Sequence, residues 1–386
     1  MLWIKQKKIK PTVLFITNQG GGAPKSLLNM VKSLRNDIHA IVLFENDQYD
    51  YKDFVSEGIE CIIVPFRMNM VLNLPGYKTI KWKIHRFWDE FFKNGLAPTR
   101  VEAALKKHGV NKVDIVHTNT GALTIGLAIA KKLHARHVWH LREFQDIDFD
   151  AFPYCGWKKF QKLIYQSDAV IGITKAIAKH FHFEKHPQSY VVWDAVASKE
   201  VATLDMKKED YILYCSSMIY HGKGLHDLIV AYGKSKLPEN GVKLLVAGTL
   251  EDEQYKETIS KLIEDYNVQN MVQFEGHQNN LKKYMVKARC FVLPSLNEGL
   301  GRVVIEAMLY GCPVIVRDSG GPQEYISHGI NGYKFTTNEE LTQLLNDVVY
   351  QDPIELVQNA QTYAITHFSE EVYGPEILKI YEELMR

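Results

Sequence analysis

Short apolar runs alternate with helical stretches along the chain. Runs of roughly four to eight apolar residues bounded by turn residues are typical of buried strands, and helices between them indicate parallel pairing. The pattern therefore predicts an α/β fold. The strands expected in the first half are Thr12–Thr17, Ala40–Phe44, Cys61–Pro65, Ile115–His117, Val138–His140, Ala169–Ile173 and Tyr190–Trp193. Those expected in the second half are Tyr211–Tyr214, Lys243–Ala247, Val272–Phe274, Cys290–Leu293 and Pro313–Val316.

A polar stretch at Ser198–Asp210 separates the two sets of strands and marks a domain boundary. We expect a first domain over residues 1–197 and a second over residues 198–368, both doubly wound. Such sheets bind ligands at the carboxyl ends of their strands, so a crevice between the domains is expected. Residues 369–386 carry a helical apolar stripe and are expected to pack back on the first domain.

Composition narrows the class of protein. The chain of 386 residues balances 46 Lys and Arg against 45 Asp and Glu, which argues against nucleic-acid binding by the whole protein. The five cysteines are scattered and form no CxxC pair, which disfavours a disulfide framework or a zinc site. No apolar run suffices for a membrane span or a secretory signal. We expect a cytoplasmic protein that can still lie on the inner face of a membrane.

The stretch PSLNEGLGRVVIEAMLYGCPVI, residues 294–315, is the most informative. Gly299 and Gly301 flank an expected strand-to-helix turn, where backbone N–H groups and the helix dipole favour a phosphate. Glu298 precedes this helix and Glu306 lies within it, so the two carboxylates can bind different hydroxyls of one long ligand. Alternatively, both are solvated acids that gain ~0.3–1 kcal/mol from the helix dipole.

This stretch, together with SGGPQEYISHGINGYKF at residues 319–335, resembles the donor-binding half of glycosyltransferase family 4, whose signature is E-x7-E. The resemblance extends to SSMIYHGKGLHDLIVAY at residues 216–232 and, in the first half, to residues 18–34, 114–133 and 167–177. It implies a GT-B architecture, in which two Rossmann-like domains face each other across a cleft. By the same resemblance, the first domain binds the acceptor and the second binds a nucleotide sugar.

The resemblance also implies an activity. It indicates a retaining glycosyltransferase that moves a sugar from a nucleotide-diphosphate donor, expected to be a UDP-sugar, to a hydroxyl of a glycan or lipid-linked saccharide in surface polysaccharide synthesis. The nucleotide sugar is then a substrate, and no cofactor is expected. We also expect no essential metal, because the family neutralises donor phosphates with protein groups and no metal-ligand spacing is visible here.

Individual roles follow from the resemblance. Lys223 takes the position that binds the donor diphosphate, Glu298 binds sugar hydroxyls, and Glu306 binds the ribose. His140 corresponds to the active-site histidine, and its titration range suits neutral pH. The expected catalytic residues are thus His140 and Glu298, and the expected donor-binding residues are Gly21, Gly22, Lys223, Gly299, Leu300, Gly301 and Glu306.

Structural explanations compete with these roles. Most of the 15 histidines must be structural, and a satisfied, partly buried His140 is the alternative to a catalytic one. His117 and Arg142 are weaker candidates. The glycines before Pro24, an expected first helical residue, present bare amides, although they can also serve only to turn the chain. Lys25 stands where a dinucleotide fingerprint needs glycine, which disfavours a nicotinamide enzyme.

One departure from the family changes the picture. An arginine usually precedes the diphosphate lysine by five or six positions, where this chain has Ser217 and Met218. The loss of a charge-assisted hydrogen bond, ~1.5–3 kcal/mol, would weaken donor binding roughly ten- to a hundred-fold. This departure motivates an alternative, a non-catalytic subunit that binds nucleotide or glycan. A sugar-nucleotide epimerase is a further alternative.

A separate signal lies at Tyr77–Leu96, YKTIKWKIHRFWDEFFKNGL. Its apolar residues follow helical spacing, and the remaining positions are mostly basic. Such a helix can rest on an anionic membrane surface near the acceptor, or it can pack on the core with a solvated basic side. The pattern alone does not choose between these two interpretations. Its apolar residues are Ile80, Ile84, Phe87, Trp88 and Phe91, and its basic ones are Lys78, Lys81, Lys83 and Arg86.

Overall fold

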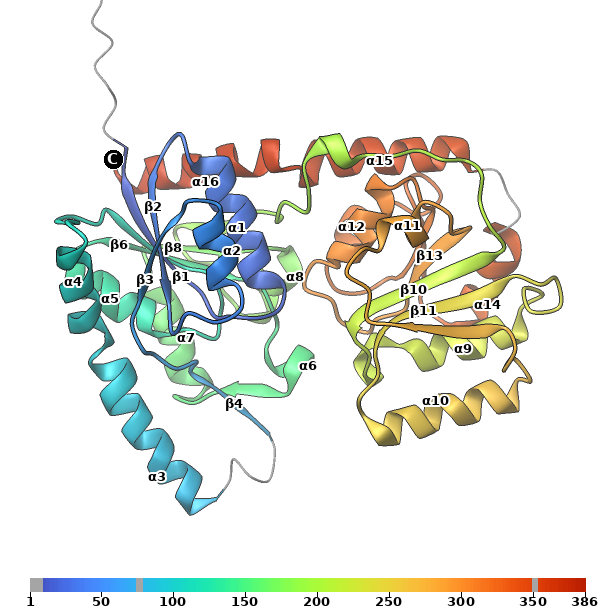
Figure 1. Ribbon diagram of the computed structural model, residues 1–386, viewed down its shortest axis with the longest axis horizontal. Coiled ribbons are helices and arrows are strands. Elements are labelled where there is room, and N and C mark those ends of the chain that lie inside the picture. The colour runs from blue at the N-terminus through green and yellow to red at the C-terminus, as the bar shows by residue number, and fades with distance from the viewer. Residues whose placement is uncertain (1–9, 74–78, 349–352) are drawn as a thin grey trace, which may run out of the picture. The chain divides into compact units, whose positions relative to one another are not determined.

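The computed structural model describes residues 10–73, 79–348 and 353–386 (Figure 1). The chain forms two compact units. The first comprises Met1–Asp194 with Tyr373–Arg386, and the second comprises Ala195–Val372. The chain thus changes unit just before residue 197, where the sequence placed a boundary, and it returns to the first unit within its last helix.

The first unit contains a parallel sheet of seven strands in the order β3-β2-β1-β5-β6-β8-β9. Its strands are β1 (Thr12–Ile16), β2 (His39–Phe44), β3 (Glu60–Ile63), β5 (Ile115–Thr118), β6 (Arg136–Leu141), β8 (Ala169–Gly172) and β9 (Ser189–Val191). Its helices include α1 (Gly22–Leu34), α2 (Tyr51–Ser56), α3 (Ile80–Asp89), α4 (Ala97–Lys107), α5 (Ile125–Leu133), α6 (Asp146–Phe149), α7 (Trp157–Tyr165) and α8 (Lys175–His180). Strands β5 and β8 are buried along their whole length, and β1 is buried after Thr12, which explains their continuous apolar runs.

Two features of the first unit leave little trace in the sequence. Strands β4 (Met70–Leu72) and β7 (Ala151–Pro153) pair antiparallel outside the main sheet, and each is too short to show a period. Helix α3 continues directly into a π-helical turn, η2 (Glu90–Gly95). Turns of this kind are rare and often mark functional places.

The second unit contains a parallel sheet of six strands in the order β12-β11-β10-β13-β14-β15. Its strands are β10 (Tyr211–Met218), β11 (Lys243–Thr249), β12 (Val272–Gly276), β13 (Cys290–Leu293), β14 (Val314–Arg317) and β15 (Tyr333–Phe335). Its helices include α9 (Leu225–Lys234), α10 (Glu253–Asp265), α11 (Lys282–Met285), α12 (Arg302–Leu309), α13 (Pro322–Tyr325), α14 (Asn338–Val348) and α15 (Ile354–Phe368), with short 3₁₀ turns η3 (Lys199–Val201) and η4 (His221–Lys223).

The predicted α/β class with two doubly wound parallel sheets is confirmed. Every expected strand overlaps an observed one, and Figure 1 shows helices on both sides of each sheet. The sequence missed β15, which has only three residues, and the polar end of β10, because Ser216–Met218 no longer alternate in an apolar pattern. The interdomain cleft stays a prediction.

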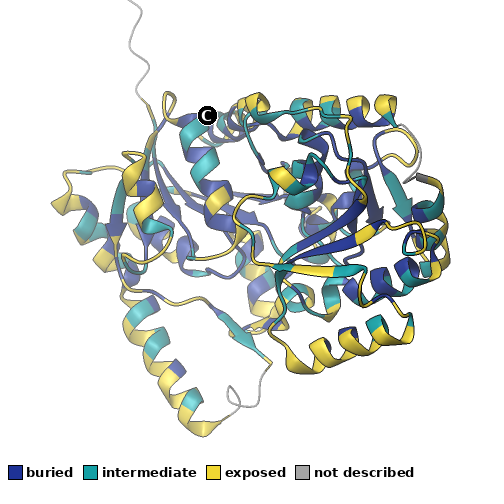
Figure 2. Ribbon diagram, turned by 45° about the vertical axis from the view of Figure 1, so that its right-hand side comes forward, coloured by how far each residue is buried: buried dark blue, intermediate teal, exposed yellow. Residues whose placement is uncertain are grey.

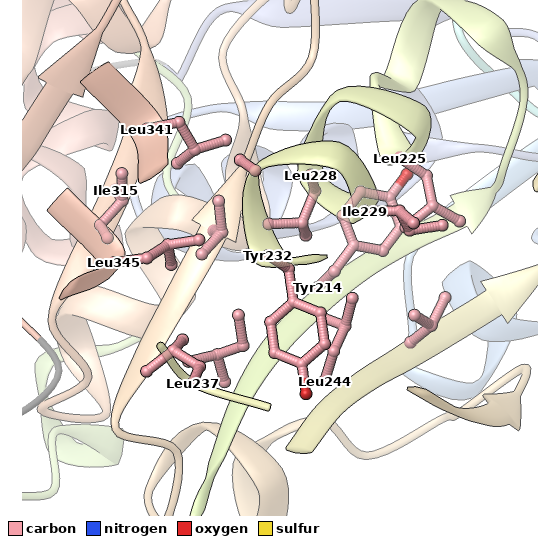
Figure 3. Close-up of a cluster of buried hydrophobic side chains, with 14 of the residues drawn as sticks. Tyr214, Leu225, Leu228, Ile229, Tyr232, Leu237, Leu244, Ile315, Leu341 and Leu345 are labelled. Carbon is pink, nitrogen blue, oxygen red and sulfur yellow. The ribbon is translucent and has the colours of Figure 1, made fainter. Parts of the chain in front are cut away.

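The core of the second unit positions its ligand-facing loops. Helix α9 packs its buried side, including Leu225, Leu228 and Tyr232, against the sheet (Figure 3). The Tyr232 hydroxyl donates to the carbonyl of Val242 over 2.7 Å, so this polar group is satisfied inside the core. The loop before α9 is therefore attached to a rigid element.

Candidate functional site

Three neighbouring strands of the second sheet end side by side. Strands β10, β13 and β14 run parallel, so their carboxyl ends meet at one edge. The loops that follow them carry Lys223, Glu298 and the pair Gly320–Gly321, respectively. We call this set of loops the second-sheet edge. Parallel topology alone thus gathers residues that are about a hundred positions apart in the sequence.

Lys223 and Glu298 form an ion pair at this edge. The Lys223 Nζ lies 2.7 Å from Glu298 Oε1, and the two side chains are 18% and 17% exposed. The Lys223 Nζ also lies 5.6 Å from the centroid of the Tyr220 ring, within cation–π range. Tyr220 had no sequence signal, since a single tyrosine before the lysine loop has no pattern. The two side chains form an ion pair in a defined position, and both remain partly exposed, so a ligand can reach them.

Glycine is required where the lysine loop meets the glutamate loop. Gly224 has φ +69°, and a Cβ there would lie 2.3 Å from the carbonyl oxygen of Pro294. Close by, the Leu296 amide donates to the Gly222 carbonyl over 2.9 Å. Backbone contact of this closeness leaves no room for a side chain. It fixes Lys223 and Glu298 relative to each other.

The glutamate loop also contacts the loop after β14. The Gly321 amide donates to the Glu298 carbonyl over 2.8 Å. A Cβ on Gly321 would lie 2.3 Å from the Gly299 carbonyl, so these glycines allow the two backbones to touch. Gly301 caps α12 with φ +76°, a left-handed conformation that favours glycine. The predicted strand-to-helix turn is thus present, supported by a glycine loop that sequence reasoning did not assign to the site.

Leu300 can contribute only through its backbone. Its side chain is buried, and its carbonyl accepts a hydrogen bond of 2.8 Å from the Tyr325 hydroxyl. The α12 N-terminus that follows has N–H groups in its first turn without intrahelical acceptors, as every helix does. A negatively charged ligand is favoured at such a position.

Glu306 lies one turn inside α12, half-buried. Burial raises the pKa of the Cys215 thiol on β10 well above its usual value, and the charges of Glu306 and Glu298 raise it further. Both glutamates therefore lie near one buried thiol.

Arg317 does not replace the arginine missing before Lys223. Ser217 and Met218 form the exposed end of β10. Arg317, at the end of β14, is already engaged, since its Nε donates to the Pro294 carbonyl over 2.9 Å and its Nη2 lies 2.5 Å from Asp227. It orders the loops rather than presenting a free charge.

In the first unit, the glycine loop follows β1. Gly20 and Gly21 have φ of +80° and +82°, and a Cβ on either would meet nothing within 4 Å. The Gly20 amide donates to Asp50 over 2.6 Å. Helix α1 begins at Gly22, so the expectation that Pro24 is its first residue is wrong; Pro24 still lies in the first turn, where a missing N–H breaks no helical bond.

His140 is completely buried in β6. Burial lowers the pKa of its imidazole well below 6.5, and the Arg142 charge lowers it further. The expectation that His140 titrates near neutral pH is therefore wrong. Arg142 Nη2 lies 3.3 Å from His140 Nδ1 and can only donate, so the neutral ring carries its proton on Nε2. That Nε2 has no hydrogen-bond partner among the described residues.

Arg142 and His117 belong to a buried network that includes the last helix, α16 (Glu370–Leu384). Arg142 pairs with Asp194 and donates to the Tyr373 hydroxyl over 3.2 Å. The Tyr381 hydroxyl lies 2.7 Å from His117 Nδ1. Both tyrosines lie on α16, so the network fastens this helix to the first sheet. Structural roles for Arg142 and His117 are the simplest account.

Known proteins resemble this arrangement. Residues 198–367 match the family model described as Glycosyl transferases group 1. The segment that matches this family model lies within the second unit. Among curated relatives, the lipopolysaccharide core biosynthesis glycosyltransferase LpsE of Rhizobium meliloti is 31% identical over 137 residues, which are 36% of this chain and 38% of LpsE. The matches span less than half the length of such curated relatives.

Solved structures are similar to this chain over nearly its whole length. HepE of Anabaena in complex with UDP has a TM-score of 0.77 at 19% identity, covering 96% of this chain and 100% of HepE. The lipopolysaccharide outer core galactosyltransferase WaaB has a TM-score of 0.71 at 16% identity, covering 96% and 99% of the two chains. These likenesses confirm the GT-B class of fold.

Glu143 is a polar residue of the first unit that sequence reasoning missed. It lies two positions after the end of β6, and its Oε2 accepts from Thr120 Oγ1 over 3.1 Å and from Gln145 Nε2 over 3.2 Å. Burial raises the pKa of its carboxyl to about 7. Gln145 has φ +70°, an uncommon conformation for this residue type. A single acid after a strand has no spacing that would reveal it.

The amphipathic stretch lies in α3 and η2, although Tyr77 and Lys78 fall outside the described residues. The interpretation as a core-packed apolar face is wrong, because its large apolar side chains are exposed and Arg86 is buried instead. Within the described residues, no helix is both long and apolar enough to cross a bilayer. The exposed residues are Ile80, Ile84, Phe87, Trp88, Phe91 and Phe92.

Proposed function

We propose that this chain is a retaining glycosyltransferase that moves a sugar from a UDP-sugar to a hydroxyl of a glycan or lipid-linked saccharide. The observation that carries the proposal is the Lys223–Glu298 pair at the second-sheet edge, within the segment that matches the family model. Structures of HepE were solved with UDP and with UDP-glucose, and LpsE is named for lipopolysaccharide core synthesis. These names support the UDP donor and the surface glycan.

The ion pair suggests how a donor binds. A diphosphate competes with Glu298 for the Lys223 ammonium, and an exchange of partners replaces one charge-assisted contact with another. Glu298 is then released to accept hydrogen bonds from sugar hydroxyls. Glu306 binds the ribose, and the backbone of Gly299–Gly301 and the α12 N-terminus face the diphosphate. Such fixed positive groups stabilise the departing diphosphate more as its charge grows.

For the first unit, the proposal retains His140 with a changed role. A neutral imidazole whose Nε2–H has no hydrogen-bond partner among the described residues is a donor, which suits a sugar oxygen better than proton abstraction does. Gly21 and Gly22 remain proposed backbone donors. With no titrating base at His140, the departing diphosphate is the proposed acceptor of the acceptor hydroxyl's proton, in a same-face substitution.

A donor-binding assay tests the proposal. UDP should bind the wild-type protein and bind Glu306→Gln less tightly. A neutral amide accepts hydrogen bonds from the ribose hydroxyls more weakly than a carboxylate does. Product analysis with a panel of UDP- and GDP-sugars then tests transfer. Sugar release that is insensitive to EDTA would support the expected independence from metal. Unchanged UDP affinity in Glu306→Gln would contradict its role.

One observation favours a second candidate, a non-catalytic nucleotide-binding subunit. Ser217 and Met218 stand where the diphosphate arginine is expected, and the nearby Arg317 is paired with Asp227. This candidate predicts UDP binding without hydrolysis or transfer of any donor sugar. Sugar release from any donor would exclude it.

A further inference from the structure

Helix α3 and the turn η2 expose their apolar side to solvent. Ile80 is 77% exposed and Trp88 is 51% exposed. In Figure 2, α3 appears largely yellow and teal, with little dark blue. We define the α3 outer face as Ile80, Ile84, Phe87, Trp88, Phe91 and Phe92. Contiguous exposed apolar surface of this kind usually marks an interaction site.

The aromatic rings of the α3 outer face form one continuous cluster. Phe87 and Trp88 have ring centroids 5.7 Å apart, and Trp88 stacks on Phe92 at 5.4 Å. Phe91 and Phe92 are in edge contact at 5.1 Å. The π-helical turn begins at Glu90 and carries the last two of these residues. The cluster is therefore a single surface rather than scattered side chains.

The opposite side of the same helix is polar and anchored. Arg86 is buried, its Nη2 donates to the Met68 carbonyl over 2.5 Å, and its guanidinium lies 5.0 Å from the Tyr154 ring centroid. Asn94 accepts from the Arg67 amide over 2.8 Å. Polar contacts thus hold the inner side in place while the aromatic side faces outward. This arrangement is the reverse of a core-packed amphipathic helix.

Charge on α3 favours an anionic partner. Lys81 and Lys83 are exposed beside the α3 outer face. The acidic residues are engaged on the other side: Asp89 pairs with Lys93 over 2.8 Å, and both Glu90 oxygens accept from Asn69 over 3.0 Å. The exposed charge is therefore mostly positive. Aromatic side chains flanked by lysines are the composition of helices that lie in a membrane interface.

The apolar surface continues beyond the helix. Trp82, Lys83, Phe152 and Tyr154 are among the residues that line a pocket of about 420 Å³ between α3 and the β4–β7 pair. Phe152 is itself exposed. A lipid surface can contact the helix and this neighbouring pocket together, because both belong to the first unit.

We propose that the α3 outer face docks the protein on an anionic phospholipid bilayer, with Phe87, Trp88 and Phe91 inserted at the headgroup level and Lys81 and Lys83 facing acidic lipid. The docking does not depend on the proposed enzymatic activity. It is an interfacial contact that leaves the bilayer uncrossed.

Vesicle flotation tests the proposal with wild-type protein and vesicles of equal parts phosphatidylcholine and phosphatidylglycerol. The variant Phe87→Ser/Trp88→Ser/Phe91→Ser should lower partitioning by roughly tenfold or more. Lys81→Gln/Lys83→Gln should lower it by about fivefold per lysine on these vesicles and leave binding to pure phosphatidylcholine unchanged. The matched control, Phe274→Ser/Ile330→Ser, removes exposed apolar side chains of the second unit and should bind as wild type does.

Quenching of tryptophan fluorescence by brominated lipid identifies the inserted residue. Wild-type protein should be quenched, and Trp88→Phe should lose the part of that quenching that comes from Trp88 while it keeps its vesicle affinity; Trp82, which lines the neighbouring pocket, can account for the remainder. Because all these side chains are exposed, thermal unfolding should show that the variants remain folded. No binding to either vesicle, equal binding by the outer-face and control variants, or a dimer that the outer-face variant abolishes would overturn the proposal.

Discussion

The carboxyl edges of the two sheets hold their charges in opposite ways. In the first unit, His140, Arg142 and Asp194 are completely enclosed, and the histidine is neutral. At the second-sheet edge, Lys223 and Glu298 remain partly exposed on loops that glycines bring together. A buried network fixes geometry and resists change, whereas an accessible ion pair can exchange partners. The second edge is therefore suited to a charged ligand, and the first to holding neutral donors in place.

The largest effect should come from breaking the buried pair. Arg142→Met leaves the Asp194 carboxylate buried without its main partner and should lower the free energy of unfolding by ~3–5 kcal/mol, measured by urea denaturation. Arg136→Met is the matched control at the start of β6, the strand that Arg142 follows, because its pair with Asp168 is partly exposed and should be worth ~0–1 kcal/mol. If both variants lost similar amounts of unfolding free energy, the buried pair would contribute no more to stability than the accessible pair, which would contradict this account.

The accessible pair should matter for ligand binding rather than stability. Lys223→Met should lower UDP affinity by roughly ten- to a hundred-fold, because a charge-assisted hydrogen bond of ~1.5–3 kcal/mol is lost. Calorimetric titration measures this. Lys243→Met changes an exposed lysine at the opposite end of β11 and should bind UDP normally. If the two variants bind UDP equally well, Lys223 does not contact the donor.

The first unit should also be sensitive to acid. The pKa values of His117 and His140 lie well below 6.5, and that of His137 is lowered to about 3. Below pH 6.5 these histidines therefore bind protons in the unfolded chain and stay unprotonated in the folded chain. Glu143, with its pKa raised to about 7, acts in the opposite direction. From pH 6.5 to 5.5 the free energy of unfolding should fall by ~2 kcal/mol. Glu143→Gln should steepen this fall; a flat profile would contradict the neutral histidines.

The smallest expected effect concerns the missing arginine. Met218→Arg places a cation at the exposed end of β10 and should raise UDP affinity by about three- to tenfold. The gain is smaller than that from a buried charged contact, because water weakens an exposed one. Met218→Gln is the neutral control. Calorimetric titration of both variants compares them. A gain shared by both would show that charge is not the cause.

Sequence reasoning recovered the parts of the site that parallel topology and motif spacing determine. Lys223 and Glu298 follow expected strands, and neighbouring parallel strands must end at the same edge. The burial of His140 could not be foreseen, because it depends on partners such as Asp194 and on a helix more than two hundred positions away. The contact of Gly321 with the glutamate loop likewise depends on the tertiary structure, which the local sequence pattern does not reveal.

The amphipathic stretch shows a different limit. Its period fixes which residues share a helix face and says nothing about where that face points. The outward orientation comes from Arg86 and Asn94, whose polar contacts hold the other side to the first unit. Strands β4 and β7, which lie beside this helix, are too short to leave a period.

Hydrogen–deuterium exchange with and without UDP tests the central claim most directly, because it reports ligand contact at each backbone amide. The proposal predicts that UDP protects the loops around Lys223 and Glu298–Gly301, and that Lys223→Met reduces this protection at equal UDP concentration. Protection confined to other segments, or none at saturating UDP, would contradict a donor site at the second-sheet edge.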